Sequence, residues 1–179
     1  MLIQIVFIYK IEINHISGLF FFDGQSKPKM LIYENNALDF KINYPNNWER
    51  LSKITNETAF IAPKESDSNT SPAGLVVKLI QVKSKNSSIN SISNALIFQL
   101  KKAYKDFKLE SKSLFNIDNK KGIKIVFTAT DTKHQIRKAS QILTIFKNKI
   151  YIITYKALPE KYSQYENTIN EIISSFKFL

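Results

Sequence analysis

Residues able to perform catalytic or metal chemistry are few in this chain. Histidine stands only at positions 15 and 134, and cysteine is absent. Without cysteine the chain has no disulfide, no thiolate zinc site and no cysteine nucleophile. His134 ends a polar stretch typical of a turn, so we expect it on the surface. One imidazole with scattered carboxylates does not predict a metal site.

The motifs that place a nucleophile, a phosphate or a calcium ion are also missing. There is no Gly-x-Ser-x-Gly elbow, and the 4 glycines form no phosphate-binding loop. Glu65 and Asp67 share a polar stretch but supply too few oxygens for calcium. The sequence therefore predicts a non-enzymatic protein with no catalytic, cofactor-binding or metal residue and no cofactor. An uncharacterised hydrolase is an alternative that requires a concave pocket with converging polar groups.

Positive charge is the strongest chemical signal. The formal net charge is +11, and arginine occurs only at Arg50 and Arg137, so the charge is almost entirely lysine. The lysines are scattered, and their densest groupings are the pairs Lys101–Lys102 and Lys120–Lys121. Because lysine is a point charge that lacks the guanidinium fork, we interpret this as a solvated basic surface. Such a surface attracts an acidic protein, membrane headgroups or a nucleic acid.

The first 29 residues differ from the rest of the chain. Residues 1–9 and 19–22 are apolar, but Lys10, Glu12 and His15 interrupt the stretch between them. The apolar runs are too short for a transmembrane helix and lack the flanks of a signal peptide. Three interpretations stay open: a degenerate export signal or membrane anchor, an extra strand, or a mistranslated stretch upstream of Met30. We therefore divide the chain into an extension, 1–29, and one domain, 30–179.

Alternation and apolar runs predict the strands that must build this domain. Residues 38–44 alternate with a period of two and end at Pro45, as a half-buried strand does. Residues 74–82 are almost continuously apolar, as in a strand covered on both faces. Further strands are predicted at 31–33, 58–62, 109–117, 122–129, 135–146, 150–155 and 175–178. Turns are predicted at 118–122 and 148–149, and a polar surface loop at 64–72.

Two amphipathic helices complete the prediction. The first spans 89–107, where Ile89, Ile92, Leu96 and Leu100 recur at three- and four-residue steps. The second starts at Pro159, a residue tolerated in the first helical turn, and runs to 176. Consecutive strands joined by tight turns imply antiparallel pairing, so the predicted class is α+β. We expect a central antiparallel sheet flanked by helices.

Several short motifs occur together in one order along the chain. They are residues 40–48 (FKINYPNNW), residues 60–63 (FIAP), the strand at 75–82, residues 149–155 (KIYIITY) and the closing residues 174–178 (SSFKF). Together they resemble the PsbP-like family, named after an extrinsic oxygen-evolving subunit of photosystem II. The likeness spans roughly residues 31–179. It implies an α/β/α sandwich with a central antiparallel sheet, in which Trp48 plugs one end.

The resemblance also implies a non-enzymatic binding or assembly module. The expected partner is an unidentified protein, met through a lysine-rich surface, with peripheral membrane association; a polyanion or nucleic-acid binder is the alternative. No binding residue is carried over, and the oligomeric state is left open. The resemblance favours an extracytoplasmic or membrane-associated protein, whereas a start at Met30 implies a cytoplasmic one.

Overall fold

The computed structural model describes residues 28–51, 56–64, 72–81, 88–104, 106–132 and 134–179. The predicted 1–29 extension lies almost wholly outside this part of the chain, so its boundary stays a prediction. Most of the predicted loop at 64–72 also lies outside it. No helix in the described part has the length and apolar character needed to cross a bilayer.

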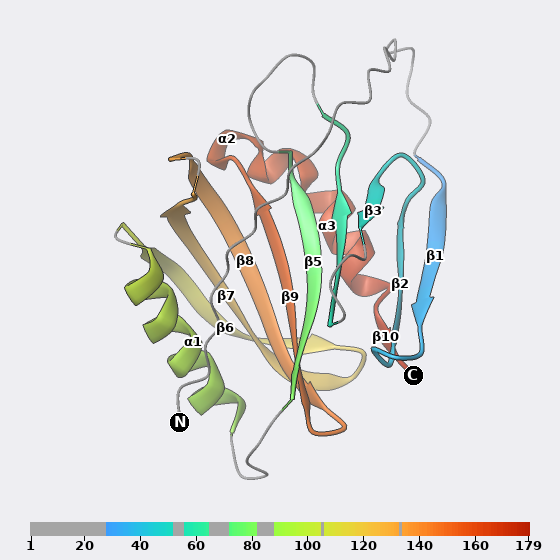
Figure 1. Cartoon of the computed structure of the whole chain (residues 1–179), viewed down its shortest axis with the longest axis horizontal. Helices are drawn as coiled ribbons and strands as arrows, with labels where there is room; N and C mark the ends of the chain where they lie inside the picture. Colours follow the sequence, from blue (N-terminus) through green and yellow to red (C-terminus); the bar gives the residue numbers. More distant parts are fainter. Residues whose placement is uncertain (1–27, 52–55, 65–71, 82–87, 105, 133) are drawn as a thin grey trace.

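Most of the described strands form one large antiparallel sheet (Figure 1). Its order is β3-β4-β5-β9-β8-β7-β6. The strands are β3 (Glu49–Leu51), β4 (Glu57–Ile61), β5 (Gly74–Gln81), β6 (Lys108–Ile117), β7 (Lys120–Thr130), β8 (Ile136–Phe146) and β9 (Lys149–Ala157). The short strand β3 was not predicted, because three residues are too few to display a period of two.

Tight turns join the long strands of this sheet. Asp118 and Asn119, between β6 and β7, have φ angles of 44° and 59°. Lys147 and Asn148, between β8 and β9, have φ angles of 45° and 60°. Positive φ at both central residues is the mark of a type I′ turn, whose twist matches that of the flanking strands. Each predicted turn is thus present, but the second lies one residue earlier than predicted.

A small second sheet packs beside the first. Its order is β1-β2-β10, and both pairings are antiparallel. Its strands are β1 (Met30–Asn35), β2 (Phe40–Pro45) and β10 (Lys177–Phe178). On β2 the side chains of Phe40 and Ile42 point inward and are fully buried, as the alternation predicted. The last strand of the chain therefore lies beside β2, near the start of the described residues.

Helix α1 (Ile89–Ala103) covers part of one face of the large sheet. The Ser88 side chain caps its first turn by accepting a hydrogen bond from the Ser91 amide at 3.1 Å. The helix ends near Tyr104, before the predicted end at 107. Phe107 continues the apolar period from outside the helix, where its ring lies 5.1 Å from that of Phe127.

The second predicted helix is divided into three pieces. They are α2 (Pro159–Tyr162), the 3₁₀ turn η1 (Ser163–Tyr165) and α3 (Glu166–Ser174). Pro159 occupies the first helical turn, as predicted. The buried side chains of this segment are Tyr162, Ile169, Ile172 and Ile173. The amphipathic character predicted for 159–176 is thus present; Tyr165 is half-buried, and Phe176 is buried just beyond the end of α3.

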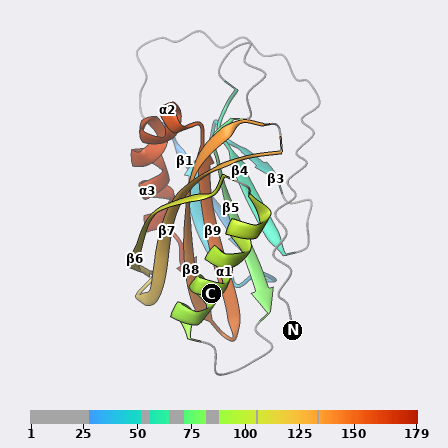
Figure 2. The same cartoon turned by 90° about the vertical axis from the view of Figure 1, so that its left-hand side faces the viewer.

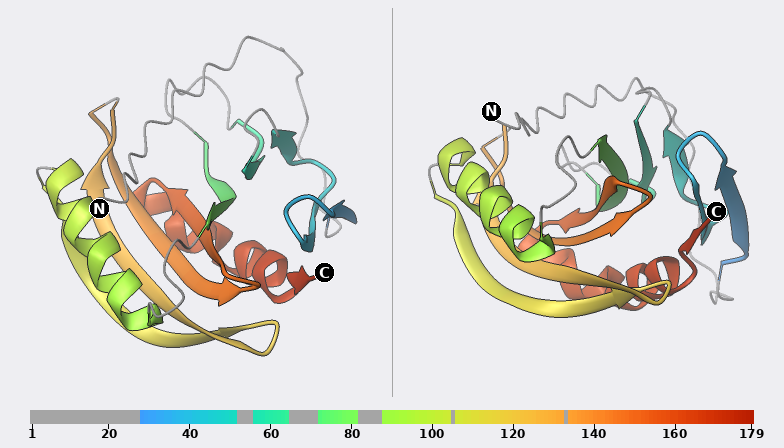
Figure 3. Two further views of the ribbon diagram at one scale, coloured as in Figure 1. Left: turned by 60° about the horizontal axis from the view of Figure 1, so that its bottom comes forward. Right: turned by 90° about the horizontal axis from the view of Figure 1, so that it is seen from below.

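The two helical segments pack against opposite faces of the large sheet (Figures 2 and 3). On β8, Ile142 belongs to the larger core with α3, whereas its neighbour Leu143 belongs to the smaller core with α1. Adjacent residues of a strand point to opposite faces. The prediction of an antiparallel sheet with helices is therefore confirmed, with the addition that a second sheet supplies part of the packing.

A candidate interaction surface

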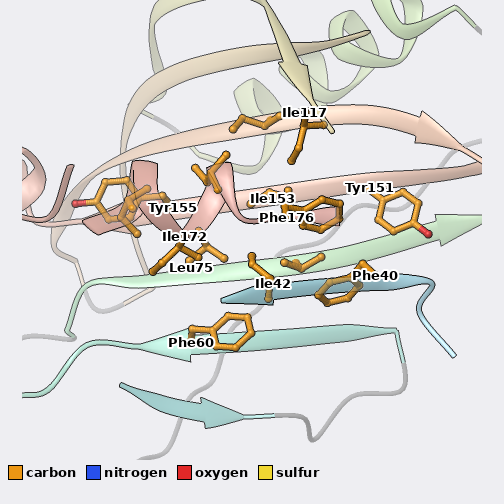
Figure 4. Packing of buried hydrophobic residues seen from close by; sticks show 14 of the residues in the cluster. Phe40, Ile42, Phe60, Leu75, Ile117, Tyr151, Ile153, Tyr155, Ile172 and Phe176 are labelled. Carbon is orange, nitrogen blue, oxygen red and sulfur yellow. The ribbon is translucent and has the colours of Figure 1, made fainter. Parts of the chain in front are cut away.

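Aromatic rings fill the larger core where β2, β9 and β10 meet, and we call this region the aromatic end. Its rings are those of Phe40, Phe146, Tyr151, Phe176 and Phe178. Figure 4 shows several of them packed between the sheets. Phe40 and Phe176 stack with their centroids 5.3 Å apart. Such pairs add stability beyond the area they bury.

Two buried tyrosines in this core donate hydrogen bonds to backbone carbonyl groups. The Tyr151 hydroxyl donates to the Leu38 carbonyl at 3.0 Å, and the Tyr155 hydroxyl donates to the Tyr162 carbonyl at 2.7 Å. Burial raises the pKa of Tyr151 to about 12, with the nearby Asp39 carboxylate adding to the effect. Burial also raises the pKa of Tyr155. Both hydroxyls therefore stay protonated and act as structural donors.

Trp48 belongs to the same core. Its indole is buried and meets the Tyr165 ring edge-on at 6.1 Å. The Trp48 amide donates to the Pro45 carbonyl at 2.9 Å, which closes the turn after β2. This placement fits the structural role expected from the sequence.

Two carboxylates bind lysines at the aromatic end. Asp39 pairs with Lys149 and Lys147 of the β8–β9 turn. Hydrogen bonding from Lys149, assisted by Lys147, holds the Asp39 pKa below its ordinary value despite some burial. The second carboxylate, Asp118, pairs with Lys177 at 2.9 Å.

Asp118 also accepts a hydrogen bond from the Phe178 amide at 2.9 Å. Burial acts to raise its pKa, but the bonds from Phe178 and Lys177 outweigh burial, so the pKa lies below its ordinary value. The tip of the β6–β7 hairpin is thereby joined to the last strand of the chain.

A different arrangement of charge occurs where β6, β7 and the end of α1 lie, and we call it the lysine edge. Its members are Lys101, Lys102, Lys108, Lys112, Lys120, Lys121 and Lys124. Apart from the half-buried Lys124, all of them are exposed. None of them forms an ion pair within the part of the chain that the structure describes.

None of the contacts that these lysines make is a direct ion pair, although the charge of Lys120 helps to lower the Asp118 pKa. Lys112 donates to the Asn94 side-chain oxygen at 2.7 Å. The Lys124 ammonium lies 5.8 Å from the centre of the Phe115 ring. The strand register places Lys124 opposite Ser113 and Lys121 opposite Asn116. The pairing of β6 with β7 therefore gathers positive charge along this edge of the sheet, with Lys112 and Lys121 on one face and Lys124 on the other.

Both arginines make contacts within the fold, Arg137 in its interior and Arg50 on its surface. Arg137 is buried and pairs with Asp131 at 3.0 Å. Arg50 lies over the Tyr33 ring at 4.9 Å. Neither contributes to the lysine edge, which can offer electrostatic attraction but no guanidinium fork for phosphates or guanine edges.

The weaker candidates from the sequence gain no support. His134 lies in a turn with a φ angle of 59° and is exposed. His15, Glu65 and Asp67 lie outside the described residues. Across the ranges that the structure describes, no group of three or more His, Asp or Glu side chains could hold a metal ion.

Comparison with known proteins decides the family. The sequence profile of a family described as PsbP-like protein matches residues 12–178. The chain belongs to the PsbP-like protein family. The resemblance seen in the turn at 40–48 and in the closing residues is thus confirmed. No curated protein sequence matches this PsbP-like chain.

Solved structures with the same fold come from a cyanobacterium, a yeast and a mycobacterium. Cyanobacterial PsbP from Synechocystis sp. PCC 6803 has a TM-score of 0.64 and 14% identity, covering 90% of this chain and 99% of its own. The Ran-binding protein Mog1p of Saccharomyces cerevisiae has a TM-score of 0.58 and 8% identity, covering 85% and 96%. LpqN of Mycobacterium tuberculosis, involved in cell envelope biogenesis, has a TM-score of 0.58 and 13% identity, covering 77% and 82%. At these identities the likeness establishes the fold, and a fold alone does not select a partner.

Proposed function

We propose that this PsbP-like protein is a non-enzymatic binding or assembly module that docks on an acidic protein partner through its lysine edge. The observation that carries this proposal is the uneven pairing of its lysines. Lys147, Lys149 and Lys177 pair with carboxylates at the aromatic end, whereas the lysine edge keeps its charge. Positive charge that no carboxylate neutralises speeds encounter with an oppositely charged surface.

The family and its fold neighbours support a binding role. Mog1p, a structural neighbour, is described as Ran-binding, and LpqN as involved in cell envelope biogenesis. From the family we propose a partner that belongs to a membrane-associated complex, reached on the extracytoplasmic side or at the membrane surface. Intact-mass measurement of the native protein in each cell fraction tests this placement, because it reveals both the compartment and the true first residue.

The docking test compares two charge reversals of equal size. The variant Lys112→Glu with Lys121→Glu changes the lysine edge, and Lys41→Glu with Lys64→Glu is the matched control on exposed lysines elsewhere. Affinity capture from native membranes and soluble fractions is quantified by mass spectrometry across a salt series. We expect wild type and control to retain the same defined partner, and the lysine-edge variant to lose it.

The salt series adds a second criterion to the docking test. At roughly 0.5 M salt the Debye length falls to about 4 Å, so charge-driven capture weakens. Equal loss of capture in both variants, or capture that salt does not weaken, would contradict docking through the lysine edge.

Nucleic-acid binding is the alternative that the positive charge keeps open. Filter binding of single- and double-stranded DNA tests it, since phosphate contacts make retention fall steeply with salt. Because both arginines are engaged within the fold, we expect no salt-dependent retention beyond that of a generic basic protein.

A further inference from the structure

β6, which carries Lys108 and Lys112 of the lysine edge, is also an open edge of the large sheet. β6 stands last in the strand order and pairs only with β7 among the described strands. Its residues 108–114 are all exposed, and Figure 3 shows the β6–β7 hairpin along the outer arc of the curled sheet. An unpaired strand edge presents a row of backbone donors and acceptors.

Turn geometry identifies the backbone groups that face outward. In a two-residue type I′ hairpin the residues flanking the turn, here Ile117 and Lys120, form a hydrogen-bonded pair. Pairs then alternate along the ladder. The amides and carbonyls of Asn116, Leu114 and Lys112 consequently point away from β7 toward the free edge.

A bulge sets the length of this free ladder. The register between β6 and β7 shifts between Leu109 and Ser111, and Glu110 pairs with Lys138 at 2.8 Å. A bulge bends its strand and interrupts the regular row of backbone groups. The regular part of the edge therefore runs from 112 to 117, about the length of an ordinary strand.

The side chains that flank this ladder define what it would accept. Lys112, Leu114 and Asn116 share one face, which also holds Lys121 opposite Asn116. Leu114 is 83% exposed, an isolated large apolar side chain between lysines. An added strand with acidic residues interspersed with apolar ones would pair its carboxylates with lysines and cover Leu114.

We propose that the edge of β6 from 112 to 117 binds an extended acidic segment of the protein partner by strand addition. This inference rests on the docking function proposed above and specifies how the partner binds. Lysines on an edge strand repel a like edge, and each copy carries +11, so a second copy fits less well than an acidic strand.

The other open edges are less suited to this partner. β3 has only 3 residues. β1 contains Glu34 and no lysine, so it lacks the charge that would select an acidic strand. β10 has only 2 residues, and Asp118 already binds its Lys177 and its Phe178 amide. Among the described edge strands, only β6 combines a regular row of free backbone groups with lysines that make no ion pair.

The first test follows individual amides with a defined probe. The probe is a capped octapeptide of alternating glutamate and valine, and its control replaces every glutamate by lysine. Amide exchange is measured by NMR on the full-length protein. We expect the glutamate peptide to slow exchange at Lys112, Leu114 and Asn116 by at least about tenfold, because these amides gain hydrogen bonds. Ser113 and Phe115 already bond to β7 and should change little.

A backbone variant separates strand addition from simple charge attraction. Leu114→Pro removes one outward amide at an edge position, where proline is tolerated. Leu114→Thr keeps the amide and serves as its matched control. Circular dichroism checks that both fold. We expect peptide affinity to fall about tenfold in the proline variant and to stay within about twofold in the threonine variant.

Three outcomes would overturn the inference. The first is peptide binding without slowed exchange on β6 and without an effect of Leu114→Pro. The second is absence of slowed exchange at millimolar probe. The third is protection of β6 that grows with protein concentration alone, together with a dimer in sedimentation, which would assign the edge to a second copy. If the first occurs while lysine-edge reversal still abolishes partner capture, docking stands and only strand addition fails.

Discussion

At its tip the β6–β7 hairpin is joined to the rest of the fold, whereas along β6 it faces solvent. Asp118 at the tip binds Lys177 and the Phe178 amide, and Ile117 is buried in the larger core. Only a few residues away, Lys112 and Leu114 are exposed. One element thus contributes both to the stability of the molecule and to the lysine edge.

The aromatic end stabilises the fold, whereas the lysine edge is the region that we propose binds a partner. Buried rings and paired charges hold the C-terminal strand and the turns together at the aromatic end. Unpaired charges repel one another at the lysine edge, a cost that a protein can bear where a partner later neutralises it. Substitutions in the aromatic end should therefore lower the free energy of unfolding, whereas charge reversal in the lysine edge should leave it unchanged or raise it slightly.

Truncating an aromatic ring should give the largest effect. Phe40 is fully buried and stacks on Phe176. Phe40→Ala should lower the free energy of unfolding by about 3–5 kcal/mol through lost burial and a residual cavity. The matched control is Phe98→Ala on α1, whose ring is 57% exposed and which should cost under about 1 kcal/mol. Urea denaturation followed by circular dichroism measures both; equal losses would erase the distinction between the two regions.

Removing a buried hydroxyl should give the next effect. Tyr151→Phe leaves the buried Leu38 carbonyl without its donor and should lower the free energy of unfolding by about 1–2 kcal/mol. The control is Tyr44→Phe. Tyr44 is half-buried, and its hydroxyl makes no hydrogen bond within the described part of the chain.

Alkaline titration adds a second readout for the same hydroxyl. The folded-state pKa of Tyr151 is raised to about 12, so the unfolded chain loses this proton first as pH rises. Stability should fall between the ordinary value of 10.0 and about 12, and Tyr151→Phe should reduce that fall. An unchanged alkaline profile in the variant would contradict the buried-donor role.

Local patterns predicted the secondary structure well. The alternation around Phe40 and Ile42 identified β2, because one face of that strand is buried. The prediction of α1 ran too far, to Phe107. The apolar period reports which side chains are buried, and it does not report where the backbone leaves the helix. The second helix kept its buried stripe but not its continuity.

The interaction surface could not be read from the sequence. Lys112 and Lys121 stand apart in the chain, and only the register of β6 against β7 places them on one face. The neutralisation of Lys149 depends on Asp39, which is separated from it by 110 positions. Scattered lysines become a paired group and an unpaired group only when the fold determines their neighbours.

Acid should weaken the aromatic end through its two carboxylates. The pKa of Asp39 is held below its ordinary value of 3.8 by Lys149 and Lys147. A lowered folded-state pKa adds stability above the unfolded value, and that stability is lost as pH falls through the folded value. Asp39→Asn should therefore lower the free energy of unfolding by under about 1 kcal/mol near neutral pH, because the pair is partly exposed.

That difference between wild type and Asp39→Asn should vanish once pH falls well below 3.8. Urea midpoints measured at about pH 7 and about pH 2.5 test the sign. A difference that grows in acid would show that Asp39 does not stabilise the fold through its charge.

The smallest effect should come from the lysine edge, and its sign should be reversed. Lys121→Glu replaces one of several unpaired positive charges by a negative one, so repulsion within the region falls. The free energy of unfolding should stay unchanged or rise by a few tenths of a kcal/mol at low salt. At about 0.5 M salt this gain should disappear by screening.

Lys149→Ala is the paired comparison, since it removes a lysine that Asp39 neutralises and should destabilise under the same conditions. Guanidinium is itself a salt, so urea is the denaturant for both variants. Destabilisation by Lys121→Glu that persists at high salt would mean that Lys121 supports the fold, and the lysine edge would then no longer be a region whose charge is free for a partner.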